Sequence, residues 1–277
     1  MAQTINTNIA SLNSARNLAA AQGSLSTSMQ RLSSGLRVNS AKDDAAGLAI
    51  AERMNSQVRG MNVGIRNAND AISLTQTAEG AIGKVADMMQ RMRELAVQAA
   101  NATNTSTDRD NLNAEFQALG TQISDTLTKT KFNGLAVVGT DAGTFTFQVG
   151  AYTADTISIA TTGLSTNTSI TVVTTGSIAG TNATNAAAAM TNIDAALTTL
   201  NTERANLGAA NNRFEAAIAT LQVSAENTAA ARGRIMDADF AAETANLSRA
   251  QILQQAGSAM LAQANQMPQQ VLQLLKG

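Results

Sequence analysis

Apolar side chains recur every seven residues along the end of the chain, from Asn246 to the last residue. The repeat fills two positions of each heptad, one with Leu253, Met260, Met267 and Leu274, the other with Ala250, Gly257, Ala264 and Val271. This spacing predicts an α-helix that carries the a and d seam of a coiled coil. Because a long apolar seam has to be covered, the repeat also predicts a partner helix.

The opposite end of the chain has a matching pattern. Residues 4–36 read as a helix with an apolar stripe whose members are 7, 4, 3 and 4 residues apart. We expect this helix to pair with the C-terminal one. Together the two helices define what we call the terminal seam: Leu18, Leu25, Met29, Leu32, Leu36, Leu253, Met260, Ala264, Met267, Val271 and Leu274.

The next segment predicts the longest helix of the chain. Ser40 and Asp43 match a capping box, which indicates a helix start near Ala41. An apolar repeat in steps of four and three then continues to about Ala100. At 1.5 Å per residue such a helix is roughly 85 Å long, a length typical of rods and bundles. A shorter helix is expected after Asp108.

Beyond Phe132-Asn133-Gly134 the chain becomes rich in Thr, Gly and Val. Apolar residues alternate with polar ones there, which predicts short strands separated by turns. The alternating sets are Phe145, Phe147 and Val149, then Ile157 and Ile159, then Ile170 and Val172. Helix is expected to resume near Asn185, and a joint at residues 237–239 precedes the last helix.

These segments predict a mainly α fold, a long antiparallel helical hairpin or coiled-coil rod with a small β-hairpin region in mid-chain. We expect residues 1–43 and 237–277 to form a terminal coiled-coil domain. Residues 44–130 and 185–236 are expected to form a helical bundle. Residues 131–184 are predicted to be its small β-rich surface part.

Several kinds of chemistry are excluded by composition. The chain has no histidine and no cysteine, so Ser/His/Asp hydrolysis, thiol chemistry and Cys/His zinc sites are impossible. The ionisable side chains of the β-rich part are Lys131, Asp141, Tyr152 and Asp155. A lysine- or carboxylate-based enzyme is still open, but no cluster of such residues indicates one, so we expect no enzyme activity, metal or cofactor.

The chain ends are basic, with four cationic residues and no acid before residue 43, namely Arg16, Arg31, Arg37 and Lys42. Such ends can bind nucleic acid or membrane, or can simply be buried helices with few charges. The sparse spacing favours the second reading, because nucleic-acid arms are denser in Lys and Arg. No signal peptide and no membrane-spanning stretch is evident.

Three stretches resemble bacterial flagellin. They are Ile5 to Leu12 (INTNIASL), Arg31 to Ile50 (RLSSGLRVNSAKDDAAGLAI), and the C-terminal pieces QQA at 254–256, LAQANQ at 261–266 and Pro268-Gln269. The resemblance covers about residues 1–150 and 185–277. It implies a short flagellin whose paired termini form an inner layer of a secreted filament and whose neighbouring segments form an outer layer. A hook–filament junction protein, which shares the terminal pattern, is the alternative.

The resemblance also implies partners and a recognition surface. Residues 90–97 (QRMRELAV) resemble the segment read by the vertebrate Toll-like receptor for flagellin. The recognition residues implied in this chain are Gln90, Arg91, Arg93, Glu94, Leu95, Val97 and Glu115. An export chaperone, a filament cap and hook-junction proteins are further implied partners, with export through a type III channel.

Self-assembly is expected to order the chain ends. The terminal seam is too small to offset the backbone entropy of roughly forty residues at about 1–2 kcal/mol each. We therefore expect both ends to fold only on polymerisation. Pro268 lies inside the predicted last helix, where we expect a local bend or loosened turn.

Overall fold

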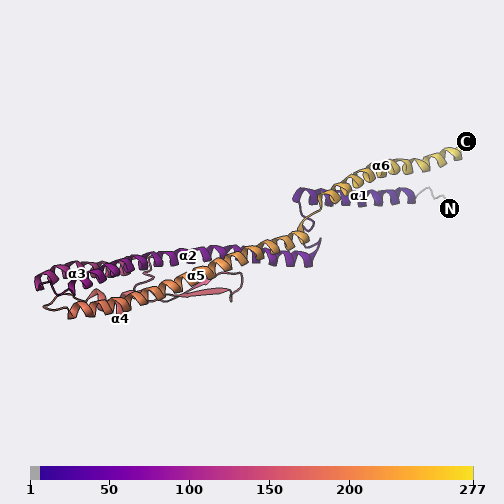
Figure 1. The fold of residues 1–277 in the computed structure, drawn as a ribbon. Helices are drawn as coiled ribbons and strands as arrows, with labels where there is room; N and C mark the ends of the chain where they lie inside the picture. Colours follow the sequence, from indigo (N-terminus) through magenta and orange to yellow (C-terminus); the bar gives the residue numbers. More distant parts are fainter. Residues whose placement is uncertain (1–6, 277) are drawn as a thin grey trace. The chain divides into compact units, whose positions relative to one another are not determined.

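The computed structural model describes residues 7–276, with side chains through residue 266. Figure 1 shows a mainly α fold, as predicted, in which two antiparallel strands are the only sheet of the described residues. The elements are α1 (Ile9–Ser34), α2 (Ala45–Ala99), α3 (Ser106–Lys129), β1 (Thr144–Gln148), β2 (Thr156–Ala160), the short 3-10 helix η1 (Leu164–Thr166), α4 (Thr168–Thr174), α5 (Thr184–Met236) and α6 (Phe240–Lys276).

The chain contains two compact units. The terminal unit comprises the residues up to 56 together with those from 227 onward, and the central unit comprises residues 57–226. The long helices α2 and α5 each contribute to both units. Residues close to either end of the chain therefore belong to one unit, and the middle of the chain belongs to the other.

In the terminal unit, α1 and α6 pack against each other in antiparallel directions (Figure 1). Near the start of α1, the Asn8 side chain donates to the Ala264 carbonyl at 2.7 Å and also caps α1 by accepting from the Ser11 amide. Near its end, Arg31 faces Glu243 at 3.9 Å. The predicted pairing of the first and last helices is therefore confirmed.

Two short segments join the helices of this unit, residues 35–44 between α1 and α2 and residues 237–239 between α5 and α6. Gly35 ends α1 in the left-handed conformation with a φ of 71°, which glycine adopts without steric cost. The Arg37 amide then donates to the Met236 carbonyl at 2.6 Å, and the Ala238 amide to the Gly35 carbonyl at 2.9 Å. These bonds hold the two joints side by side over a small apolar cluster that includes Val38 and Met236.

The predicted start of the second helix is wrong by about one turn. Residue Asp43 does not act in a helical capping box with Ser40; its carboxylate accepts from the Asn39 and Ser40 amides and the Ser40 hydroxyl. Such local bonds hold the backbone in a turn and compete with helix formation. Helix α2 begins at Ala45 instead, and Asp44 accepts from the Gly47 amide at 2.8 Å.

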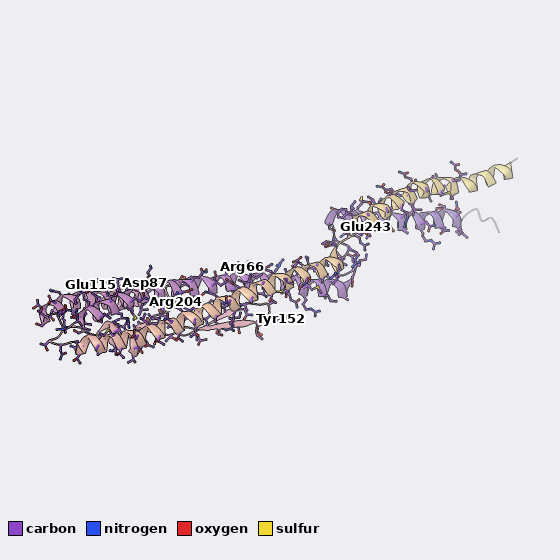
Figure 2. The ribbon with its side chains drawn as sticks, viewed as in Figure 1. Arg66, Asp87, Glu115, Tyr152, Arg204 and Glu243 are labelled. Atoms are coloured by element: carbon purple, nitrogen blue, oxygen red, sulfur yellow. The ribbon has the colours of Figure 1, made fainter. Side chains whose placement is uncertain are left out.

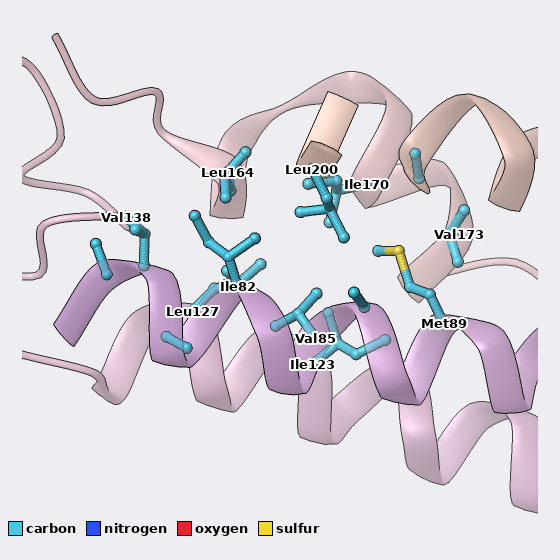
Figure 3. Close-up of a cluster of buried hydrophobic side chains, with 14 of the residues drawn as sticks. Ile82, Val85, Met89, Ile123, Leu127, Val138, Leu164, Ile170, Val173 and Leu200 are labelled. Carbon is cyan, nitrogen blue, oxygen red and sulfur yellow. The ribbon is translucent and has the colours of Figure 1, made fainter. Parts of the chain in front are cut away.

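The core of the central unit lies where α2, α3 and α5 meet. Figure 3 shows its large apolar side chains interleaving, with α2 contributing Ile82 and Met89, α3 contributing Ile123, and α5 contributing Leu200. All of these side chains are fully buried. Further along α5, Phe214 is also fully buried. Its ring packs edge-on against the ring of Phe147 in β1, with the ring centroids 5.7 Å apart.

The third predicted strand is wrong. Residues 168–174 form the short helix α4, which Asn167 caps by accepting from the Ser169 amide at 3.0 Å. Ile170 and Val173, three residues apart, are buried, whereas Val172 is 42% exposed. The alternation of Ile170 and Val172 is too short to distinguish a strand from a helix, and the Asn167 cap favours the helix.

The β-hairpin is seated on α2 by two glycines one helical turn apart. A methyl group at Gly60 would lie 2.8 Å from the Ala151 side chain, and one at Gly64 would collide with the Val149 carbonyl. The Asn67 side chain donates to the Gln148 carbonyl at 2.8 Å, and Gln57 donates to the Tyr152 hydroxyl at 2.5 Å. Because both glycines lack a side chain, the hairpin backbone can approach the helix closely.

Candidate assembly and recognition surfaces

The two terminal helices meet through small residues. On α6, Ala250 and Ala264 are buried and Gly257 is half-buried, and a methyl group at Gly257 would lie 3.3 Å from the Leu18 side chain. On α1, the buried residues are Ala21 and Ser28. The terminal-seam residues Leu18, Leu25 and Leu32 of α1 are half-buried, as is Leu36, which follows the end of α1. The small-residue positions of the C-terminal heptads thus face α1.

The larger members of the terminal seam on α6 lie at the surface. Leu253 is 54% exposed and Met260 is 63% exposed, although both occupy heptad positions of the predicted seam. On α1, Met29 is 54% exposed, and Ile9 and Leu12 are also exposed. The side chains of the remaining members, Met267, Val271 and Leu274, are not among those described. The backbone at Pro268 is part of α6, and the local bend or loosened turn there stays a prediction. Within the described part, the apolar face of α6 is only half covered.

A groove of about 1060 Å³ follows the uncovered side of the helix pair. Its apolar part is formed by Ala20 and Ala21 of α1 with Leu253 and Met260 of α6, and its polar end by Arg31 and Glu243. The Glu243 side chain, labelled in Figure 2, is 11% exposed and has Arg31 as its ion-pair partner at 3.9 Å. The Nε atom of Arg31 is buried and makes no hydrogen bond within the described residues. The groove is therefore an apolar surface with incompletely satisfied charges at one end.

The recognition residues taken from the resemblance lie near the end of α2. Gln90, Arg91, Arg93, Glu94 and Val97 are exposed, whereas Leu95 is 1% exposed and belongs to the core. Glu115 is exposed on α3 (Figure 2). The structure therefore brings Arg91, Glu94 and Glu115 together, places Arg93 beside α5, and buries the Leu95 side chain.

Ion pairs join these charged residues across helices. Arg91 contacts Glu115 of α3 at 2.9 Å and Glu94 at 2.8 Å, and the two carboxylates, Glu115 first, raise the pKa of Arg91. Arg93 contacts Asp194 of α5 at 2.7 Å, and this guanidinium lowers the pKa of the Asp194 carboxyl. Sequence reasoning missed Asp194, because it lies about a hundred residues from Arg93 and no local pattern marks it.

A second, smaller groove of about 280 Å³ lies between α2 and α5 in the central unit. It is lined by Gly80, Gly83 and Asp87 of α2 and by Asn201 and Arg204 of α5, among others; Asp87 and Arg204 are labelled in Figure 2. Added methyl groups at Gly80 or Gly83 would meet nothing within 4 Å. Neither glycine is therefore required by the packing of its own chain.

The described residues contain no group of three or more His, Cys, Asp or Glu arranged to hold a metal ion. A search of the same residues for a helix both long enough and apolar enough to span a membrane found none.

Comparison with known proteins gives consistent matches. Residues 5–138 match the family model for the bacterial flagellin N-terminal helical region, and residues 190–275 match that for the C-terminal helical region. A flagellin of Halalkalibacterium halodurans is 44% identical over 98% of this chain and 99% of its own length.

Solved structures agree with these matches. The crystal structure of Bacillus cereus flagellin is 33% identical, covers 60% of this chain and 94% of its own, and superimposes with a TM-score of 0.51. A Vibrio parahaemolyticus structure titled as a flagellar hook-associated protein covers 70% of this chain and 99% of its own with a TM-score of 0.54. Its identity of 16% shows a shared fold alone.

Proposed function

The chain belongs to the bacterial flagellin family, and we propose that the uncovered half of its terminal seam is the surface through which it polymerises. Flagellins are structural proteins, so the chain is a filament subunit and not an enzyme. Copies of the chain assemble into a homopolymer, which is the extracellular filament of the bacterial flagellum. Because such a filament is built from copies of one chain, each subunit must present a surface that other copies can cover.

The exposure of Leu253 and Met260 carries the proposal. Both side chains border the groove beside Ala20 and Ala21, whose small size leaves room for an approaching helix. Fully burying a side chain such as Leu or Met is worth about 1.5–3 kcal/mol. A neighbouring copy that covers the groove gains this energy at several positions at once, and copies related by a head-to-tail operation that does not close form a filament.

The few buried residues of α1 support folding of the ends on assembly. Its buried positions are one alanine and one serine, Ala21 and Ser28. An isolated pair of helices with so small a core cannot offset the entropy of ordering its backbone. We propose that α1 and α6 become fully ordered only when neighbouring copies cover them. Limited proteolysis of the monomer is expected to remove both ends first, and protection of residues 7–34 in the monomer would contradict this.

Truncation tests the polymerisation surface. A chain that lacks residues 254–277 keeps Leu253 but loses the later C-terminal members of the terminal seam, namely Met260, Ala264, Met267, Val271 and Leu274. We expect it to add no length to short filament seeds, measured by light scattering and electron microscopy. A circular dichroism spectrum that retains the helical signal of the central unit is the control for folding. Normal elongation by the truncated chain contradicts the proposal.

We further propose that different parts of the chain form different layers of the filament. In this proposal, residues 1–43 with 237–277 line the inside of the filament, residues 44–130 with 185–236 form the layer around them, and residues 131–184 lie at the surface. Export chaperone, filament cap and hook-junction proteins are the proposed further partners, and the ends are proposed to pass unfolded through a type III export channel.

Recognition by the vertebrate Toll-like receptor is a second proposed function. The supporting observation is the exposed charged surface formed by Arg91, Glu94 and Glu115 from two helices, joined by ion pairs. Leu95 would contribute by holding α2 in the core rather than by contact, since it is buried. A receptor reporter assay with Arg91→Ala is expected to lose most of its signal, whereas Arg66→Ala, a change on the same helix, keeps it.

A further inference from the structure

The turn at residues 132–135 connects α3 to the core segment after it. The Phe132 amide donates to the Leu135 carbonyl at 2.9 Å, and the Leu135 amide donates back to the Phe132 carbonyl at 3.0 Å. The two central residues have positive φ angles, 48° at Asn133 and 86° at Gly134. This is the geometry of a tight hairpin turn, for which Asn-Gly is the preferred pair.

Both central residues of this turn are exposed and have free amide groups. The Asn133 side chain and the Gly134 amide take part in no hydrogen bond of the described residues. Among the asparagines of the chain, Asn133 alone is followed by glycine. Because glycine has no Cβ, nothing on residue 134 hinders contact between its amide nitrogen and the neighbouring carboxamide.

We propose that Asn133 is a site of spontaneous backbone modification. The Gly134 amide nitrogen attacks the Asn133 Cγ atom and loses its proton to water; the new N–Cγ bond replaces the Cγ–Nδ2 bond, and ammonia leaves. The resulting succinimide is opened by water at either of its two carbonyls. One opening gives aspartate, and the other gives isoaspartate, in which the backbone runs through the former side chain and is longer by one methylene.

Other asparagines lack one of these conditions. Asn39 is followed by Ser40, whose amide already donates to the Asp43 carboxylate at 2.9 Å and whose Cβ hinders the approach. Asn104 and Asn185 use their side-chain amides to bind backbone carbonyls, those of Gln98 and Ala179. Asn133 therefore combines an unhindered nucleophile, an unbound carboxamide and access to water.

The product changes a turn that the core depends on. The next residues along the chain, Ala136, Val137 and Val138, are buried in the central unit. An additional methylene between Phe132 and Leu135 disturbs the two hydrogen bonds that set the direction of this segment. The new carboxylate also adds a negative charge two residues from Lys131. Isoaspartate formation is thus expected to loosen the connection after α3, whereas aspartate, which tolerates the same backbone conformation, changes it less.

Peptide mapping of the full chain tests the proposal. The folded protein is kept in mildly alkaline buffer, and the mass gain and isoaspartate content of each asparagine peptide are followed by mass spectrometry and enzymatic isoaspartate methylation. We expect modification at Asn133 roughly tenfold faster than at Asn39, because glycine alone leaves the nitrogen unhindered. The control Asn133→Gln forms a less favourable ring and stays unmodified there.

The same chain in denaturant measures the reactivity of the sequence without its turn. If Asn133 reacts in denaturant but stays intact in the folded protein over the same period, the folded turn prevents the reaction and the proposal fails. It also fails if another asparagine of the folded chain reacts first. Asn133→Asp separates the two products, because an aged sample that melts below this variant contains the destabilising isoaspartate.

Discussion

The central and terminal units bury very different side chains. In the central unit, Phe116, Phe214, Ile82 and Met89 are fully buried, and three helices share one core. In the terminal unit, two helices meet through alanine, serine and glycine while Leu253 and Met260 remain more than half exposed. The central unit thus completes its core within one chain, whereas the terminal unit leaves Leu253 and Met260 uncovered, at the surface that we propose to be the polymerisation surface.

A core truncation in the central unit tests its self-sufficiency most severely. Phe214→Ala removes a fully buried ring that contacts Phe147, and we expect the free energy of unfolding to fall by about 3–5 kcal/mol. The measurement is denaturant unfolding of the monomer followed by circular dichroism. Val223→Ala on the same helix, at a residue 58% exposed, is the control and should change stability by less than about 0.5 kcal/mol. A loss below about 1 kcal/mol for Phe214→Ala would show that this core is not closely packed.

The opposite response is expected at Leu253 in the terminal unit. Leu253→Ala should leave the stability of the monomer within about 0.5 kcal/mol, because the side chain is 54% exposed there. In the filament it loses up to about 1.5–3 kcal/mol of burial, which raises the monomer concentration needed for growth roughly tenfold or more. Seeded growth at several concentrations measures this threshold.

Gln255→Ala, an exposed change on α6 outside the groove lining, is the matched control. It should polymerise at the threshold of the unchanged chain. If Leu253→Ala also grows at that threshold, Leu253 is not covered in the filament and the contrast between the two units fails at this residue.

The sequence patterns predict the helices, but they do not predict which side chains of each helix are buried. The heptads predicted both terminal helices, but a heptad has two apolar positions and does not say which partner each will meet. Gly257 and Ala264 pack against α1, because small side chains let two helices approach closely. Leu253, by contrast, remains 54% exposed. The Arg93–Asp194 ion pair and the turn at Asp43 were not predicted for the same reason. Each depends on which of several possible hydrogen bonds or ion pairs forms in the folded chain.

Glycines sharpen the comparison at single positions of the central unit. Gly80→Ala adds a methyl group in open space and reduces the conformational freedom of the unfolded chain. We therefore expect the free energy of unfolding to rise by about 0.5–1 kcal/mol. Gly60→Ala places the same group 2.8 Å from Ala151 and should lower stability despite the same gain in helix propensity. Thermal unfolding of the two monomers gives the signs. Equal shifts would mean that the hairpin is not seated on α2 at Gly60.

Acid titration probes the ion pairs and caps of the central unit, where the expected effect is the smallest. Two of its carboxyls, Asp108 bound by Thr105 and Asp194 bound by Arg93, have pKa values below the ordinary 3.8. A carboxyl whose pKa is lower in the folded state contributes stability above its unfolded value and loses it as the pH falls through its folded value. The central unit should therefore weaken as the pH drops below about 3.8, the ordinary value of both groups.

Asp194→Asn removes one of these contributions. Because asparagine does not titrate, the variant should be slightly less stable than the unchanged chain near neutral pH, and the difference should shrink below pH 3.8. Denaturant unfolding at a series of pH values measures it. Asp70→Asn, at an exposed residue of α2 whose side chain makes no hydrogen bond or ion pair with the described residues, is the control. A difference that stays constant down to low pH would mean that Asp194 acts through its shape rather than its charge, and that the bond between α2 and α5 at Arg93 does not depend on ionisation.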